Sequence, residues 1–160
     1  MGAARKGLYW DEFNTGDVFE SGGRTITESD IVAFAALSGD WNPLHCDAEF
    51  AKKTPFGQRI AHGLLGMTVA SGLGDREGIL EGTLIAFLGL EWSFKAPIFI
   101  GDTIRQRRTV MEKIEASSKS ASGAAQTERG IMKWKVEILN QKNEVVQEGI
   151  RTVLMKRKTS

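Results

Sequence analysis

The sequence of 160 residues has little that could anchor or cross-link it. Its single cysteine, Cys46, cannot form a disulfide within the chain. A chain without disulfides suits a reducing compartment, and we expect a cytoplasmic location. Spanning a bilayer takes about 20 apolar residues, and the longest apolar stretches, such as residues 84–90, are far shorter. Arg5 and Lys6 are not followed by an apolar core, so no signal peptide is expected.

The sequence also lacks an excess of charge of either sign. Lysine and arginine number 21, aspartate and glutamate 20, and the formal net charge is +1. This balance predicts neither a nucleic-acid partner nor a membrane partner. Hydrophobic residues make up 41% and charged residues 26%, which is ordinary for a globular protein. We therefore expect one domain over residues 1–160, with residues 1–10 as a poorly ordered tail.

Helical signals fill the first half of the chain, after a short strand and turn in residues 17–27. Thr27 and Asp30 form a capping signature, and Gly39 is a good terminator for the helix between them. A longer helix is expected from about His62–Gly63 to Leu73. Apolar residues occupy nearly every face of this longer helix, which predicts burial on all sides.

Strand signals fill the second half. Apolar residues alternate in residues 84–94 and again in 132–138, and residues 104–111 and 145–155 read as further strands. Residues 140–143 are expected to form a hairpin turn, and residues 117–130 a polar, mobile loop. The sequence thus predicts an α+β fold, in which the long helix packs against the concave face of an antiparallel sheet of four or five strands. Open sheet edges favour pairing with a second copy.

The segment from Asp40 to His45 carries the strongest chemical signal. It places a carboxylate and an imidazole five residues apart on a loop that Pro43 stiffens. These two groups, with ordinary pKa values of about 3.9 and 6.5, are suited to activating water near neutral pH. Seventeen residues after His45, His62 and Gly63 open the long helix, whose first amides can bind an oxyanion.

These motifs resemble those of a known family. Ser38-Gly39-Asp40-x-Asn42-Pro43-Leu44-His45, followed by Ile60-Ala61-His62-Gly63-Leu64 and Ser71, is similar to the MaoC-like dehydratases, which include the (R)-specific enoyl-CoA hydratases. The later Phe94-Lys95-x-Pro97-x-Phe99-x-Gly101-Asp102 resembles the strand motif of the same family. The resemblance covers the chain from Asp17 to its end.

The resemblance implies a hotdog fold, with an antiparallel sheet of about five strands wrapped around a long central helix, and a homodimer or higher homo-oligomer. It implies reversible syn addition of water to a trans-2-enoyl thioester, giving a (3R)-hydroxyacyl thioester. Asp40 and His45 are then expected to activate the water, Gly63 to donate its amide to the thioester carbonyl, Ser71 to orient Asp40, and Asn42 to shape the loop. The substrate is expected to be an acyl-CoA or an acyl-carrier-protein thioester. Coenzyme A would be part of the substrate, and neither a cofactor nor a metal is expected.

Several alternatives stay open at this stage. The chain could be a non-catalytic or partner-dependent subunit that binds acyl thioesters, or a hotdog acyl-CoA thioesterase, although the helix expected from Gly63 to Leu73 has no acid. His62 is expected to make a structural hydrogen bond, since the spacing of Asp40, His45 and His62 does not favour a metal triad. Arg105, Arg107 and Arg108 are possible contacts for the phosphates of coenzyme A, but charges alternating along a strand are typical of a solvated surface.

Overall fold

The helices of this chain lie in its first half, and the four long strands of the sheet follow them in the sequence. The computed structural model describes residues 7–115 and 128–158. Its elements are η1 (Trp10–Glu12), β1 (Val18–Glu20), β2 (Arg24–Thr25), α1 (Glu28–Ser38), α2 (Pro43–Cys46), α3 (Ala48–Ala51), α4 (Gly63–Arg76), β3 (Leu84–Phe94), β4 (Thr103–Glu115), β5 (Arg129–Leu139) and β6 (Val145–Lys156). Within the described ranges, no helix is long and apolar enough to cross a membrane.

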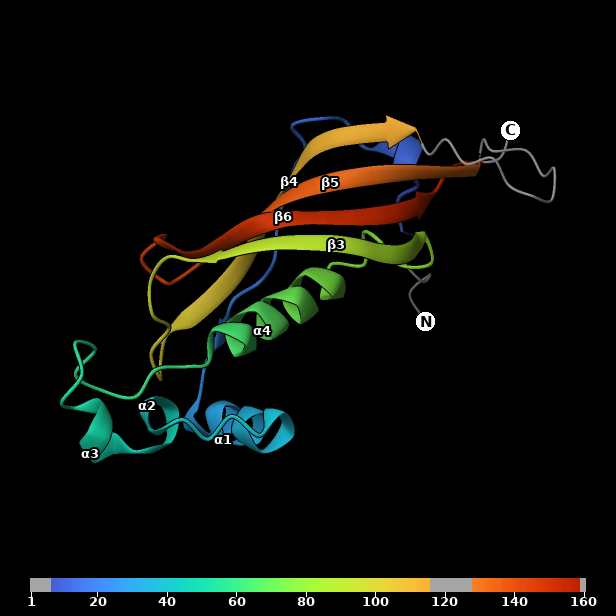
Figure 1. Ribbon diagram of the computed structural model, residues 1–160. Helices are drawn as coiled ribbons and strands as arrows, with labels where there is room; N and C mark the ends of the chain where they lie inside the picture. The colour runs from blue at the N-terminus through green and yellow to red at the C-terminus, as the bar shows by residue number, and fades with distance from the viewer. Residues whose placement is uncertain (1–6, 116–127, 159–160) are drawn as a thin grey trace, which may run out of the picture.

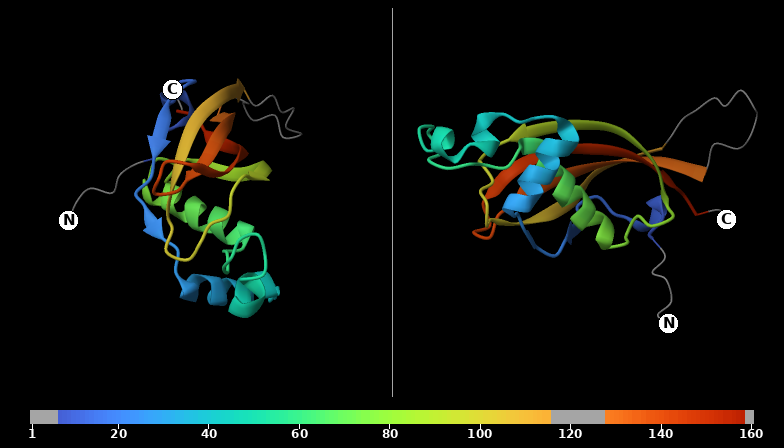
Figure 2. Two further views of the ribbon diagram at one scale, coloured as in Figure 1. Left: turned by 90° about the vertical axis from the view of Figure 1, so that its left-hand side faces the viewer. Right: turned by 90° about the horizontal axis from the view of Figure 1, so that it is seen from below.

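The strands form one antiparallel sheet in the order β1-β4-β5-β6-β3, and β2 adds a short sixth strand against β4. Figure 1 shows α4 lying along one face of this sheet, with α1, α2 and α3 gathered beyond one end of it. Figure 2 shows the same arrangement from the side and from below. A curved antiparallel sheet around one long helix is the hotdog architecture, so the predicted fold is confirmed. The short strands β1 and β2 both pair with β4.

Helix α1 forms where its capping residues predict it. The Thr27 side chain accepts a hydrogen bond from the Asp30 amide, and the Asp30 carboxylate accepts one from the Thr27 amide. Gly39 ends the helix in the left-handed conformation, with φ of 76°. This conformation costs glycine little and turns the chain directly into Asp40.

Helix α4 lies close against the sheet because glycines face it. A Cβ at Gly66 would lie 2.5 Å from Ile98 Cδ1, and one at Gly74 would lie 2.1 Å from Gln106 Oε1. Three sheet side chains also donate hydrogen bonds to carbonyls of α4: Gln147 to Gly63 (3.0 Å), Gln106 to Ala70 (3.0 Å) and Arg108 to Gly74 (2.7 Å). These contacts fix the helix against the strands over its whole length.

Two expectations need correction. Residues 7–10 are not a loose tail: the Gly7 and Leu8 amides bond to the carbonyls of Glu81 and Ile79, and Trp10 is buried. Helix α4 is also not buried on all sides, because Leu64 is 55% exposed while Leu65, Val69 and Leu73 are buried. The apolar residues on its outer face therefore do not serve the core of a single chain. Most of the polar loop expected at residues 117–130 lies outside the described residues.

Candidate active site

Asp40 and His45 lie together on the segment between α1 and α3. Asp40 follows the end of α1, and His45 lies in the short helix α2. The Asp40 carboxylate accepts a hydrogen bond from the Asn42 amide at 3.2 Å, and the Asn42 side chain accepts one from the Leu44 amide at 3.0 Å. Pro43 occupies the first turn of α2, where its missing amide proton costs nothing. This chain of local bonds sets the separation between the carboxylate and the imidazole.

The tautomer of His45 follows from its partner. Its Nδ1 lies 2.8 Å from the carbonyl oxygen of Ile60, which can only accept, so Nδ1 carries the proton. Nε2 is then the nitrogen with a free lone pair. An imidazole held in this way presents a base on one side and a fixed anchor on the other.

His62 joins the pair from the residue just before α4. Its Nε2 donates to the backbone carbonyl of Asp40 at 2.9 Å, which confirms the structural hydrogen bond expected for it. Its ring stacks on that of His45, with 3.9 Å between centroids and 29° between planes. His62 is buried, and its Nδ1 has no partner among the described residues. One carboxylate oxygen of Asp40 and one ring nitrogen of each histidine lie within 4.8 Å of one another.

The amino end of α4 lies beside this cluster. Among the described residues, neither the Gly63 nor the Leu64 amide finds an acceptor, as expected for the first turn of a helix. His45 and Gly63 line the same cavity of about 500 Å³, together with Leu64, Phe94 and Lys95. The Phe94 ring covers Gly63 so closely that a Cβ there would lie 2.6 Å from it. Unsatisfied amides, an imidazole and a cavity thus meet at one place.

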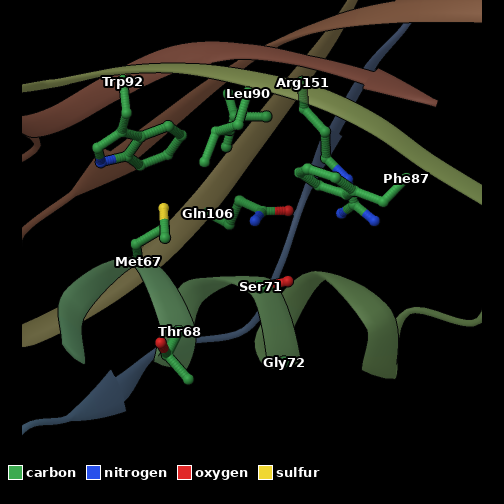
Figure 3. Close-up of a pocket in the computed structure, with 10 residues that line it drawn as sticks. Met67, Thr68, Ser71, Gly72, Phe87, Leu90, Trp92, Gln106 and Arg151 are labelled. Atoms are coloured by element: carbon green, nitrogen blue, oxygen red, sulfur yellow. The ribbon is translucent and has the colours of Figure 1, made fainter. Parts of the chain in front are cut away.

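Ser71 is not brought to Asp40. It lies eight residues beyond Gly63 on α4, which is about 12 Å along the axis. Within the described chain no hydrogen bond links it to Asp40. It lines a second cavity, of about 290 Å³, between α4 and the sheet (Figure 3). The orienting contact expected for Asp40 comes instead from the Asn42 amide and, through the backbone, from His62.

The arginines of β4 divide by strand alternation. Arg105 and Arg107 point outward and pair with Glu20. Arg108 points inward, is 2% exposed and bonds to α4, so it is not available to solvent phosphates. Burial, and the nearby charge of Arg151, lower the pKa of Arg108 to about 10. Of the three arginines suggested as phosphate contacts, Arg108 is therefore excluded.

Residues 13–129 match the model of the MaoC like domain. The chain belongs to this family. A 3-hydroxybutyryl-CoA dehydratase of Methylorubrum extorquens is 39% identical over 108 residues, which are 67% of this chain and 66% of that protein. The chain spans between 35% and 66% of the length of four such curated relatives.

Solved structures agree over more of the chain. A protein of Archaeoglobus fulgius described as a monoamine oxidase regulatory protein has a TM-score of 0.85 and 37% identity, covering 98% of this chain and 99% of its own. The (R)-hydratase of A. caviae involved in PHA biosynthesis has a TM-score of 0.67 and 28% identity, covering 92% of this chain and 98% of its own.

Two residues of interest were not singled out by their sequence pattern. His62 was expected only to brace the structure, although it is one of only two histidines, and it stacks on the other one. Arg151 was read as part of an ordinary strand. Alternation along β6 could have found it, since Arg151 shares a face with the buried residues Gln147, Val153 and Met155.

Proposed function

We propose that this protein reversibly adds water to a trans-2-enoyl thioester and gives the (3R)-hydroxyacyl thioester. One observation carries the proposal: Asp40 and His45 present a carboxylate and an imidazole within 4.8 Å, beside the free amides that open α4. A water that makes hydrogen bonds of about 2.8 Å can join two atoms up to about 5.6 Å apart. The pair can therefore hold one water between them.

The proposed reaction uses this water as both nucleophile and proton source. Its oxygen bonds to C3 of the enoyl group while the Asp40–His45 pair takes one of its protons. The π electrons of the C2=C3 bond move towards the thioester carbonyl, and the pair returns a proton to C2 on the same face. The net change is addition of H and OH, so the pair ends as it began. His45 acts through Nε2, because the Ile60 carbonyl holds the proton on Nδ1.

Negative charge develops on the thioester oxygen during this step. We propose that the Gly63 amide donates to that oxygen and that the helix dipole of α4 adds a favourable potential. A fixed donor of this kind is typically worth about 3 kcal/mol of transition-state stabilisation. Asn42 keeps the loop in shape through the Leu44 amide.

The relatives support the reaction class, since the matched proteins include a dehydratase acting on a hydroxyacyl-CoA and an (R)-hydratase. The (3R) outcome and the choice between coenzyme A and an acyl carrier protein are part of the proposal. We propose that no metal and no cofactor takes part. The stacked rings of His45 and His62 are nearly parallel, and zinc needs two nitrogens pointing at one ion from about 2.0–2.1 Å.

A thioesterase fits this site less well. A carboxylate on the central helix would have to face the thioester carbonyl, but the one acidic residue of α4 is Asp75. It lies twelve residues from Gly63, about 18 Å along the helix. A non-catalytic binding subunit would not need the Asp40–His45 pair.

We also propose that the protein acts as a homo-oligomer, in the cytoplasm. Strand β3 ends the described sheet, so its outer edge is unpaired there. It carries exposed apolar residues: Ile85, Phe87, Leu88, Leu90 and Phe94. An open edge with this composition favours pairing with a second copy. Size-exclusion chromatography with light scattering measures the mass directly.

The test of function is an assay of crotonyl-CoA and trans-2-hexenoyl-CoA by loss of enoyl absorbance, with chiral analysis of the product. Asp40→Asn should lower kcat by about 10²–10⁴-fold, as expected for loss of a general acid–base group. The matched control is Glu49→Gln, which changes an exposed carboxylate paired with Lys52 and should leave kcat unchanged. Full activity in Asp40→Asn would contradict the catalytic role proposed for Asp40. Release of the free thiol of coenzyme A would favour a thioesterase.

A further inference from the structure

The cavity at His45 and the cavity at Ser71 are both lined by residues of α4 and β3, one after the other along the helix. On α4, residues spaced by four line them in turn: Gly63 in the first, Met67 and Ser71 in the second. On β3, Phe94 lines the first and Trp92 the second. A substrate held by its thioester at Gly63 would extend along α4 towards Ser71.

Trp92 and Gln147 mark the junction between the two cavities. The Trp92 indole donates to Gln147 Oε1 at 3.1 Å, and Gln147 Nε2 donates to the Gly63 carbonyl at 3.0 Å. Both polar atoms of the Gln147 side chain therefore have a partner within the protein. Gln147 therefore forms part of the wall between the two cavities. Recognition of the substrate's acyl chain is left to the residues that line the second cavity.

Beyond the junction the second cavity has mostly apolar walls and one cation. Met67, Leu90, Trp92 and Val136 line it together with Arg151 (Figure 3). Arg151 is 7% exposed, and burial lowers its pKa. Among the described residues its side chain makes neither an ion pair nor a hydrogen bond, and Nε is buried without a partner. Its one specific contact is with the Phe87 ring, 5.1 Å from the guanidinium carbon.

A buried cation without an ion-pair partner is costly. Burial lowers the pKa of Arg151 more than the charge of Asp75 raises it, and no ion pair joins these two side chains among the described residues. Arg108 cannot relieve this cost, because it is a second buried cation and is bonded to the Gly74 carbonyl. Among the described residues that line the cavity, the other buried atom without a hydrogen-bond partner is Gln106 Oε1, a neutral acceptor. Leaving a neutral acceptor unpaired costs less free energy than leaving a charge unpaired. The cation therefore decides which ligand the cavity prefers.

We propose that Arg151 binds a carboxylate at the far end of the acyl chain, so that the preferred substrates are thioesters of dicarboxylic acids. This proposal rests on the proposed function, since it takes the thioester end to lie at Gly63. A guanidinium and a carboxylate form paired, charge-assisted hydrogen bonds, which an apolar cavity strengthens. Arg151 thereby becomes the residue that determines acyl specificity.

The spacing of the two ends sets the chain length. Ser71 is about 12 Å beyond Gly63 on α4, and Arg151 is four residues, about 13 Å, beyond Gln147 on β6. Hydrogen bonds of about 3 Å at each end leave about 6–7 Å for the ligand. An extended chain advances about 1.2 Å per bond, and a C–O bond at each end takes up part of this length, so the fitting acyl group has about four to six carbon atoms.

The experiment compares trans-2-hexenedioyl-CoA with trans-2-hexenoyl-CoA, which have the same length and differ in a terminal carboxylate against a methyl group. We expect the natural protein to favour the dicarboxylic substrate at least tenfold in kcat/KM. Arg151→Met should lower that value at least 100-fold while leaving trans-2-hexenoyl-CoA within about threefold. Arg151→Lys should keep part of the preference. Arg129→Met, which removes an exposed arginine at the start of β5 that lines neither cavity, is the matched control and should change neither value.

Equal or better hydration of trans-2-hexenoyl-CoA by the natural protein would overturn the proposal, as would an equal effect of Arg151→Met on both substrates. A preference for 6-hydroxy-trans-2-hexenoyl-CoA over the dicarboxylic substrate would assign the cavity to a hydroxyl group and would also overturn it. If neither enoyl-CoA is hydrated, the proposed function fails. Calorimetry with adipyl-CoA and hexanoyl-CoA then still tests Arg151, because tighter binding of adipyl-CoA that Arg151→Met abolishes supports the carboxylate site, and equal binding refutes it.

Discussion

His62 donates a 2.9 Å hydrogen bond to the backbone carbonyl of Asp40, although 22 residues separate them in the chain. The bond ties the loop after α1 to the residue that precedes α4. Because the His62 ring also stacks on His45, one side chain contacts both halves of the proposed catalytic pair. The geometry of that pair relative to the Gly63 amide therefore depends on His62.

Replacing His62 should misplace the pair without removing it. We expect His62→Leu to lower kcat by about 10²-fold, since a shift of about 1 Å in a catalytic group can cost that much. The free energy of unfolding should fall by about 1–3 kcal/mol, because the Asp40 carbonyl loses its donor. Steady-state kinetics and urea unfolding measure both effects. An unchanged kcat would show that His62 is only structural.

Gly63 should not tolerate a side chain. In Gly63→Ala the new Cβ would lie 2.6 Å from the Phe94 ring, so the ring must move and the cavity beside the amide must change shape. We expect kcat/KM to fall at least tenfold, and the double variant Gly63→Ala, Phe94→Ala to recover part of it. Gly22→Ala is the control, because its Cβ would meet no described atom within 4 Å and Gly22 lines neither cavity. It should leave the kinetics unchanged, and a similar kinetic loss in both glycine variants would argue against a specific role for Gly63.

The ionisation of Asp30 should make the free energy of unfolding depend on pH at acidic pH. Partial burial alone would raise the pKa of Asp30, but hydrogen bonds from Thr27 and the charge of Arg24 outweigh it, and the pKa is lowered. A carboxylate with a lowered folded-state pKa stabilises fully above its unfolded value of about 3.9 and loses that contribution as pH falls through the folded value. Asp30→Asn should therefore cost about 1 kcal/mol at pH 7. The difference from the natural protein should shrink progressively below about pH 4, as measured by urea unfolding.

The matched control for Asp30 is Glu49→Gln, whose carboxylate is exposed and pairs only with Lys52 among the described side chains. Exposed pairs of this kind contribute about 0–1 kcal/mol, so little change is expected at either pH. A difference for Asp30→Asn that stays constant down to pH 2 would contradict the assignment.

Metal removal should leave the activity intact. Asp40, His45 and His62 bring three possible ligand atoms within 4.8 Å, so the absence of a metal requirement needs a direct test. Protein dialysed against a chelator should keep its kcat, and elemental analysis should find far less than one equivalent of zinc. Loss of activity on dialysis, restored by added zinc, would contradict the metal-free mechanism and show that the activity requires zinc.

Local signals in the sequence predicted much of the fold and part of the site. The capping pair Thr27 and Asp30 and the terminator Gly39 placed α1, since these effects act within one turn of a helix. Period-two alternation placed β5 and β6, because side chains of a strand alternate whatever it pairs with. Asp40, Asn42 and His45 were identified from a short motif, and the resemblance to a family supplied Gly63 and Ser71.

Long-range contacts were beyond the same signals. The sequence pattern does not show that Ser71 lies about 12 Å along α4 from Gly63 and in a different cavity, or that residues 7–10 pack beside Ile79 and Glu81. The all-round apolar character of α4 suggested complete burial, yet Leu64 is exposed in the single chain. A hydrophobic pattern records which residues avoid water, and it does not record whether the same chain or another copy covers them.

The sequence by itself determined the elements, the fold class and the residues capable of water chemistry, because propensity, capping and short motifs act over a few neighbouring residues. Only the tertiary structure decided which of those residues meet. It stacked His62 on His45, set the free amide of Gly63 in the cavity that His45 lines, and buried Arg151 in the second cavity beside α4. Such meetings depend on how β6, α4 and the loop after α1 pack together. That packing is a sum of many weak contacts between distant segments, and no local pattern encodes it.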